Sequence, residues 1–154
     1  MNARFSPDRV YRYRLERVVA PLAHGTVCFI LLNPSTADEE TDDPTIRRCM
    51  GYVKAWGYRR RVVVNLFAYR STDPKALRKV TDPWGDENAY EIYHAAQAAD
   101  LVVGGWGTHG AFKNTGRNTV AMLRHRKVDV YALGLTKGYE PVHPLYQRAD
   151  LRAE

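Results

Sequence analysis

Four segments dominated by apolar residues predict buried strands. They are residues 26–32, 61–65, 101–105 and 128–133. Apolar runs of this kind are typical of strands that helices cover on both faces. Residues 11–19 instead alternate polar and apolar positions, which predicts an amphipathic strand.

Three segments between these strands place apolar residues at helical spacing. The first begins at the pair Asp43-Pro44, which suits an N-cap and a first turn, and Gly57 ends it. The pair Asp82-Pro83 is predicted to open the second helix, and the third covers about residues 115–126. Alternating strands and helices predict an α/β fold, specifically a three-layer α/β/α sandwich with a mainly parallel sheet. We expect one domain over residues 1–154, with its core at about 10–148.

The composition is that of a globular protein. The 154 residues are 45% hydrophobic and 26% charged, which excludes disorder, collagen and coiled coil. The sequence contains no run of 18 apolar residues, so we expect no transmembrane helix. The first residues lack the apolar core of a signal peptide. The two cysteines, Cys28 and Cys49, cannot build a disulfide framework or a four-thiolate metal cluster. We therefore expect a cytoplasmic protein without a cofactor, in which both cysteines are small buried hydrophobes.

The charge is basic and unevenly distributed. Lys and Arg number 23 against 17 Asp and Glu, and 17 of the 23 are Arg. Residues 46–61 carry six basic groups and no acid, which suits a DNA or nucleotide partner, although a solvated helix would also look like this. Residues 38–43 carry five carboxylates, which could form a solvated loop before a helix cap or hold a divalent cation. We expect no metal there and leave the oligomeric state open.

Polar and aromatic residues follow each predicted strand. In open α/β sheets, ligands bind at the carboxyl ends of the strands. The segments found there mix Gly or Pro with amides, hydroxyls, His and aromatic side chains, and they cover residues 32–38, 65–74, 104–110 and 134–146. This mixture suits a flat ligand that is stacked on its faces and hydrogen-bonded at its edges. The glycines around Trp106 lack the pattern of a phosphate-binding or dinucleotide loop, and no serine-nucleophile elbow occurs.

Each of the main candidates also has a structural interpretation. Asn33 precedes Pro34 in a common turn sequence, and Asn65 could bond to the protein as readily as to a ligand. Trp106 could be a core residue, with the neighbouring glycines allowing the backbone to approach closely. His143 could belong to a surface turn.

Several of these segments together resemble one family. They are Asn33-Pro-Ser-Thr-Ala-Asp38, Asp43-Pro-Thr-Ile-Arg-Arg48, Asn65-Leu-Phe-Ala-Tyr-Arg70, Gly134-Leu-Thr-Lys137 and His143-Pro-Leu-Tyr146. On these residues the chain is identified as a member of the domain of unknown function 1643 family over about residues 10–148. That family implies no reaction.

The order of the motifs also resembles the uracil-DNA glycosylase superfamily. Leu32-Asn33-Pro34 is similar to its first motif, in which an Asp or Asn positions the attacking water, but Leu31 stands where that family has Gly. Asn65 matches an Asn that ends a strand and reads the base edge, and Gly105-Trp106-Gly107 is similar to a Leu-Trp-Gly strand end. His143-Pro144 matches a His-Pro-Ser motif, with Leu145 in place of Ser.

The resemblance implies a glycosylase-like fold and a role for each candidate. Asn33 and His143 would be catalytic, holding water and donating to the base oxygen. Asn65 would pair with the base edge, while Phe67 or Tyr69 would stack on its face. Ser35, Thr36 and Lys137 would hold phosphates, and Leu145 and Tyr146 would fill the gap left by a flipped nucleotide. Arg70 and Trp106 are further substrate-binding candidates. The expected function is a base-excising N-glycoside hydrolase on DNA or a nucleotide; the alternative is a module that binds such ligands without cleavage.

Overall fold

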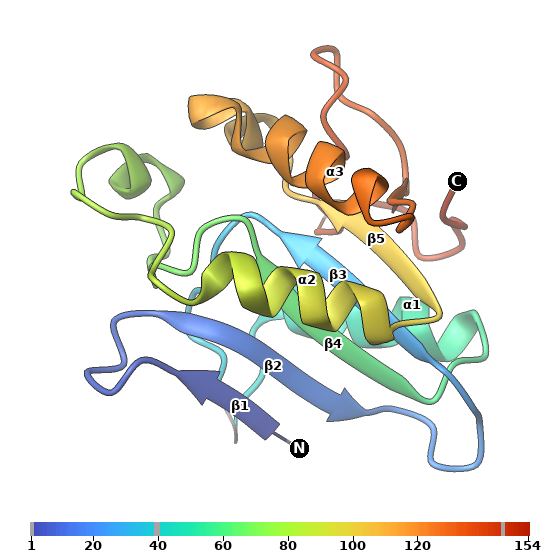
Figure 1. Cartoon of the computed structure of the whole chain (residues 1–154). Coiled ribbons are helices and arrows are strands. Elements are labelled where there is room, and N and C mark those ends of the chain that lie inside the picture. The colour runs from blue at the N-terminus through green and yellow to red at the C-terminus, as the bar shows by residue number, and fades with distance from the viewer. Residues whose placement is uncertain (1, 39–40, 146) are drawn as a thin grey trace.

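The computed structural model describes residues 2–38, 41–145 and 147–154. It is an α/β fold with a mixed six-stranded sheet in the order β1-β2-β4-β3-β5-β6 (Figure 1). The strands are β1 (Asn2–Phe5), β2 (Arg12–Val18), β3 (Thr26–Leu31), β4 (Arg60–Asn65), β5 (Leu101–Gly105) and β6 (Tyr131–Ala132). The helices are α1 (Pro44–Ala55), α2 (Asn88–Ala98) and α3 (Thr115–His125), with short 3-10 helices η1 (Pro74–Arg78) and η2 (Thr108–Asn114).

The four strands β4, β3, β5 and β6 run parallel; β2 pairs antiparallel with β4, and β1 pairs antiparallel with β2. The carboxyl ends of β3, β4 and β5 are in register, since Leu31 pairs with Asn65 on one side and with Gly105 on the other. Three of the sequence-predicted ligand segments therefore start from one edge of the sheet.

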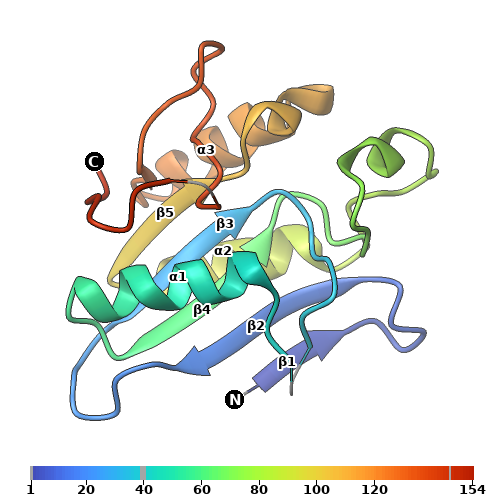
Figure 2. The same cartoon turned by 180° about the vertical axis from the view of Figure 1, so that it is seen from behind.

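Helices cover both faces of the sheet. α1 packs on one face, and α2 and α3 pack on the other (Figures 1 and 2). The side chains of β3 alternate between two hydrophobic clusters, with Phe29 and Leu31 on the α1 side and Cys28 and Ile30 on the side of α2 and α3. This explains why the strand reads as an unbroken apolar run: both of its faces are buried.

The start of α1 agrees with its sequence signal. The side chain of Asp43 accepts a hydrogen bond from the backbone N–H of Ile46 at 2.9 Å, and Pro44 lies in the first turn. An N-cap carboxylate satisfies one of the free N–H groups at a helix start and favours the helix dipole. Gly57 follows the end of the helix with a φ of 81°, a conformation that suits glycine.

The second helix begins later than predicted. The carboxylate of Asp82 accepts hydrogen bonds from the backbone N–H groups of Trp84 and Gly85, both at 3.1 Å, and so closes a turn. Gly85 has a φ of 85°, which interrupts any helix, and α2 starts only at Asn88. An Asp before Pro can cap a helix or close a turn, and here it closes a turn.

The last predicted strand is much shorter than residues 128–133, since β6 pairs with β5 only at Tyr131 and Ala132. Its other side is occupied by Glu154: Ala132 N donates to Glu154 O, and Glu154 N donates to Ala132 O, each at 2.8 Å. The segment before Glu154 packs on α1, where Trp56 Nε1 donates to Leu151 O at 3.0 Å.

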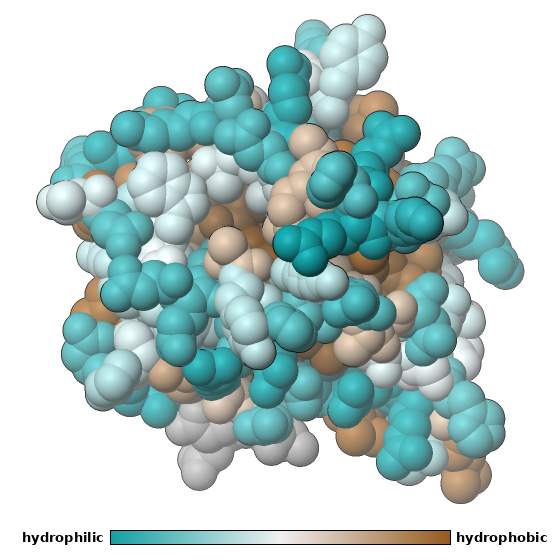
Figure 3. All heavy atoms as spheres, in the orientation of Figure 1, coloured by the Kyte–Doolittle hydropathy of each residue, from teal (hydrophilic) through white to brown (hydrophobic). Residues whose placement is uncertain are grey.

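The face that carries α2 and α3 presents mostly hydrophilic residues, with scattered hydrophobic ones (Figure 3). None of the helices in the described part of the chain is both long and apolar enough to span a bilayer.

Candidate functional site

Asn65 ends β4 with a buried and unpaired amide. Its side chain is 1% exposed, and within the described residues neither Nδ2 nor Oδ1 has a hydrogen-bond partner. Strand alternation places it on the α1 side, two residues after Val63 of the α1-side cluster. Its backbone is held firmly, because Asn88 Nδ2 donates to Asn65 O at 2.8 Å and to Leu66 O at 3.1 Å. An unpaired buried amide costs about 1–3 kcal/mol, which makes Asn65 a candidate for binding a ligand.

The segment His143-Pro144 lies directly on the carboxyl ends of the neighbouring strands. A Cβ added at Gly105 would be 2.9 Å from Pro144 Cδ and 3.1 Å from Leu31 Cδ2. Only a residue without a side chain allows Pro144 to approach β5 this closely. Because Leu31 pairs with both Asn65 and Gly105, this segment and Asn65 occupy the same edge of the sheet.

The imidazole of His143 has a defined hydrogen-bond pattern. Its Nδ1 accepts from the backbone N–H of Leu145 at 3.2 Å. Burial lowers the pKa of His143 below its usual value, while the charge of Asp43 raises it in part. A neutral imidazole whose Nδ1 accepts carries its proton on Nε2, so the free nitrogen of this ring is a donor.

Asn33, by contrast, bonds to the protein. Its Nδ2 donates to Ser71 O at 2.9 Å, to Pro34 O at 3.2 Å and to Tyr69 O at 3.4 Å. The amide thus ties the loop after β3 to the loop after β4. This is the structural role that the turn sequence allowed, and these hydrogen bonds occupy the amide nitrogen of Asn33.

Two buried arginines that sequence reasoning did not single out lie near the start of α1. Arg12 Nη1 donates to Ala37 O at 2.9 Å, and Arg61 Nη1 donates to Ile46 O at 2.9 Å. The side chain of Asp43 is the shared neighbour, because its charge acts on Arg12, Arg61 and His143.

The sequence analysis placed Arg61 among the six basic groups of residues 46–61 that suit a DNA or nucleotide partner, but Arg61 is fully buried. The other five basic residues of that stretch are exposed or half-buried; they are Arg47, Arg48, Lys54, Arg59 and Arg60. The signal that could have identified Arg61 as buried is its position as the first residue of the predicted buried strand 61–65.

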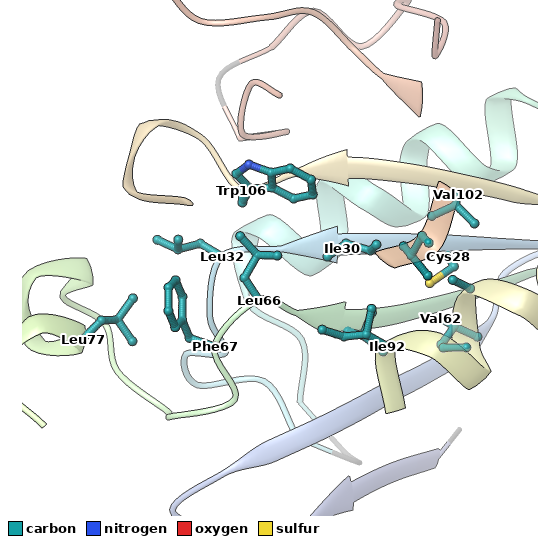
Figure 4. Packing of buried hydrophobic residues seen from close by; sticks show 14 residues of the cluster. Cys28, Ile30, Leu32, Val62, Leu66, Phe67, Leu77, Ile92, Val102 and Trp106 are labelled. Atoms are coloured by element: carbon teal, nitrogen blue, oxygen red, sulfur yellow. The ribbon is translucent and has the colours of Figure 1, made fainter. Parts of the chain in front are cut away.

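Trp106, which follows β5, and Phe67, which follows β4, lie in the hydrophobic core on the face of the sheet that α2 and α3 cover (Figure 4). Trp106 is 1% exposed and its Nε1 donates to Glu140 Oε2 at 2.6 Å. Phe67 packs against Trp84 and Phe112, with ring centroids 6.0 Å away in each case. Both rings therefore belong to the face of the sheet opposite the one to which strand alternation assigns Asn65.

Four further candidates line one shallow depression of about 440 Å³ beside Asn33. They are Ser35, Thr36, Tyr69 and Arg70. Arg70 Nε donates to Ser35 O at 3.5 Å, which holds the two loops together at this point.

The last three candidates are scattered. Lys137 is exposed on the hairpin between Leu135 and Pro141. Leu145 lines a depression of about 570 Å³ against α1, next to Arg47 and Arg48. Tyr146 lies outside the described residues.

The described carboxylates of the acidic run have partners in the protein. Arg17 Nε donates to Asp42 Oδ1 at 3.1 Å, Asp38 Oδ1 accepts from Thr41 N at 2.8 Å, and Asp43 caps α1. Among residues 2–38, 41–145 and 147–154, no three His, Cys, Asp or Glu side chains are grouped as a metal site requires.

Comparison with known proteins identifies a family but supplies no activity. No curated protein and no solved structure matches the chain. The family described as "Protein of unknown function (DUF1643)" matches residues 12–145, from the first residue of β2 to Leu145 beyond His143. The resemblance to this family that the motifs indicated is confirmed, and the chain belongs to the DUF1643 family.

Proposed function

We propose that this protein recognises a nucleobase, in DNA or in a nucleotide, at the edge of the sheet where Asn65 and His143 lie. The fold would be a glycosylase-like α/β/α sandwich, and the reaction would be hydrolysis of the N-glycosidic bond. The single observation that carries the proposal is the buried amide of Asn65, whose donor and acceptor both lack a partner among the described residues.

A primary amide is suited to the edge of a base. It offers an acceptor and a donor side by side, and bases present the complementary pair along their Watson–Crick edges. Discrimination by such an amide is strong, because a ligand that lacks one of the groups leaves a buried polar atom unpaired. Asn65 is covered in this structure, so a ligand must displace the side chains around it.

His143 supports the hydrolase. Cleavage breaks the bond between the sugar carbon and the base nitrogen, the electron pair leaves with the base, and water adds its hydroxyl to the sugar carbon and its proton to the base side. A neutral imidazole with its proton on Nε2 can donate to an oxygen of the departing base as negative charge develops there. Burial, which lowers the pKa of His143, keeps the ring in this neutral form at pH 7.

Asn33 favours the second candidate, which is recognition of the same ligands without cleavage. Its amide nitrogen already donates to the carbonyls of Ser71 and Tyr69. An amide that is hydrogen-bonded in this way is less free to position an attacking water. A protein without a water-positioning group would bind the nucleobase but would not hydrolyse the N-glycosidic bond.

A polyanionic partner is part of the proposal. Exposed basic residues lie on α1 and after it, and α3 adds Arg117 and Arg124. Phosphate contacts release counterions, so affinity for oligonucleotides should fall steeply as salt rises.

The test combines base release with binding. Single- and double-stranded oligonucleotides carrying normal, deaminated and modified bases are assayed for base release, and the same set with nucleosides and nucleotides is assayed for binding at two salt concentrations. Asn65→Leu keeps the size of the side chain and removes its polar atoms, so it should abolish binding while leaving the fold intact. Asn118→Leu changes an exposed asparagine on α3 and is the matched control.

Base release that depends on Asn65 and His143 supports the hydrolase, and binding without release supports the second candidate. Unchanged affinity in Asn65→Leu, or no binding to any member of the set at low salt, would overturn the proposal.

A further inference from the structure

Three arginines of the sheet are buried on the α1 side, and they differ in what they contact. Arg17 has a carboxylate, since its Nε donates to Asp42 at 3.1 Å, and its other nitrogens donate to the carbonyls of Glu16 and Asp38. Arg12 and Arg61 are buried at least as deeply, at 1% and 0% exposure. Each has one hydrogen bond to a backbone carbonyl and no carboxylate bonded to it in the described residues.

The donors that remain on these two guanidinium groups are enclosed. Arg12 Nε, Arg61 Nε and Arg61 Nη2 are inaccessible to solvent and have no acceptor within the part of the chain that is described. Transferring a guanidinium away from water without acceptors costs several kcal/mol, and proteins meet that cost with a paired anion. Burial lowers the pKa of both groups to about 10, which leaves them charged at pH 7.

Asp43 does not fill this need by itself. Its charge acts on both arginines, but its side chain accepts its hydrogen bond from Ile46 N at the cap of α1. Around the first turn of α1 the three guanidinium groups of Arg12, Arg17 and Arg61 face the two carboxylates of Asp42 and Asp43. A further negative group would balance them.

We propose that Arg12 and Arg61 bind an oxyanion of the phosphate type beside the first turn of α1. Guanidinium N–H groups match the oxygens of phosphate in both geometry and charge. The anion could be the phosphate of a nucleotide or free inorganic phosphate, which share this chemistry. The inference uses different atoms from base recognition at Asn65 and holds whether or not a base binds there.

The first arm of the test uses the wild-type protein and inorganic phosphate. Calorimetric titration and thermal unfolding are run against chloride at matched ionic strength. Phosphate should bind with a saturable isotherm and raise Tm by several degrees, whereas chloride should not. Equal effects of the two anions would overturn the proposal, because they would show general screening.

The second arm locates the anion. Arg61→Met replaces the guanidinium with an apolar chain of similar length, a change that buried ion sites often tolerate. It should weaken phosphate binding by at least about tenfold, as loss of charged hydrogen bonds does. The control is Arg60→Met, which removes an exposed arginine one residue earlier and should leave the affinity unchanged. Equal affinity in Arg61→Met and wild type would also overturn the proposal.

If Arg61→Met does not fold, hydrogen exchange on the wild type decides. Phosphate should slow amide exchange around Ala37 and Ile46, whose carbonyls hold the two arginines. Slowing elsewhere only, or none, would contradict the site.

The third arm separates the sources of the anion and the two proposals. A nucleoside monophosphate that binds more tightly than phosphate, with the difference lost in Asn65→Leu, indicates a nucleotide. Equal affinity for the two indicates free phosphate, and it would defeat base recognition while leaving the oxyanion site intact. Binding of a nucleoside without binding of phosphate would overturn the oxyanion site while supporting base recognition.

Discussion

The indole of Trp106 and the carboxylate of Glu140 are joined by a hydrogen bond of 2.6 Å between Nε1 and Oε2. This bond links the residue after β5 to the end of the hairpin between Leu135 and Pro141. Backbone is packed tightly around the ring: a Cβ added at Gly110 would be 1.9 Å from Trp106 Cδ1. The indole therefore holds together β5, η2 and the hairpin.

We predict that Trp106→Phe and Glu140→Gln are coupled in stability. Each removes part of one charge-assisted hydrogen bond, so the double variant should be more stable than the sum of the single effects predicts, by about 1 kcal/mol. Urea unfolding of the four proteins gives the coupling energy. Ligand affinity per folded molecule should stay unchanged in Trp106→Phe, and a selective loss of affinity would place the ring at the ligand after all.

Gly110→Ala should destabilise the protein by about 3 kcal/mol or more, because the new methyl group would collide with Trp106. Gly51→Ala is the matched control: it lies within α1, and apart from its chain neighbours and the helix's own backbone no described atom lies within 4 Å of the added Cβ. That variant should gain about 0.5–1 kcal/mol from a smaller loss of backbone entropy. Thermal unfolding of both tests the contrast, which would fail if the two glycines behaved alike.

Asn33→Asp should cost about 2–3 kcal/mol at pH 7. The amide nitrogen donates to carbonyl oxygens, and a carboxylate in its place cannot donate and is repelled by them. Asn118→Asp, at an exposed position, should change stability by less than about 0.5 kcal/mol. If Asn33 instead served mainly to hold water, Asp would retain both stability and activity.

The stability contribution of His143 should depend on pH. Burial, opposed in part by Asp43, lowers its pKa from the usual 6.5 in the folded state. The neutral ring is therefore favoured by folding, and its contribution is full above about pH 6.5 and is lost as pH falls through the folded pKa. The Tm of wild type minus that of His143→Gln should decrease between pH 7.5 and pH 5. A constant difference would show that His143 titrates equally in the folded and unfolded chain.

Both cysteines should resist thiol reagents in the folded protein. Cys28 and Cys49 are buried, and burial raises the pKa of each to about 12, so the thiolate is scarce and inaccessible. At pH 8 the labelling rate should rise with urea in parallel with unfolding. Fast labelling of one cysteine without urea would indicate local opening at that strand or helix.

The sequence was most informative where one local signal had one meaning. The apolar run of β3 predicted a strand covered on both faces, and both of its faces are buried. The pair Asp43-Pro44 marked the start of α1. The pair Asp82-Pro83 looked the same, but its meaning depended on Gly85, whose conformation turns the chain before α2 begins.

The site was harder to predict because polarity along the chain does not reveal the direction of a side chain. Asn33 follows β3 and Asn65 ends β4, yet one bonds to the protein and the other has no partner in the described residues. Arg12 and Arg61 looked like ordinary charges on a strand. Only the tertiary structure places Arg61 under α1 and Trp106 on the opposite face of the sheet.

The pairing of Ala132 with Glu154 has a consequence for self-association. A free strand edge is a template on which another molecule can add a strand, and this is a common route to aggregation or strand exchange. At β6 the chain fills that template with its own residues, through two backbone hydrogen bonds of 2.8 Å. Sheet growth past β6 would first require this pairing to open. Conditions that detach the segment around Glu154 from β6 are therefore those under which intermolecular β-structure should begin on this side of the molecule.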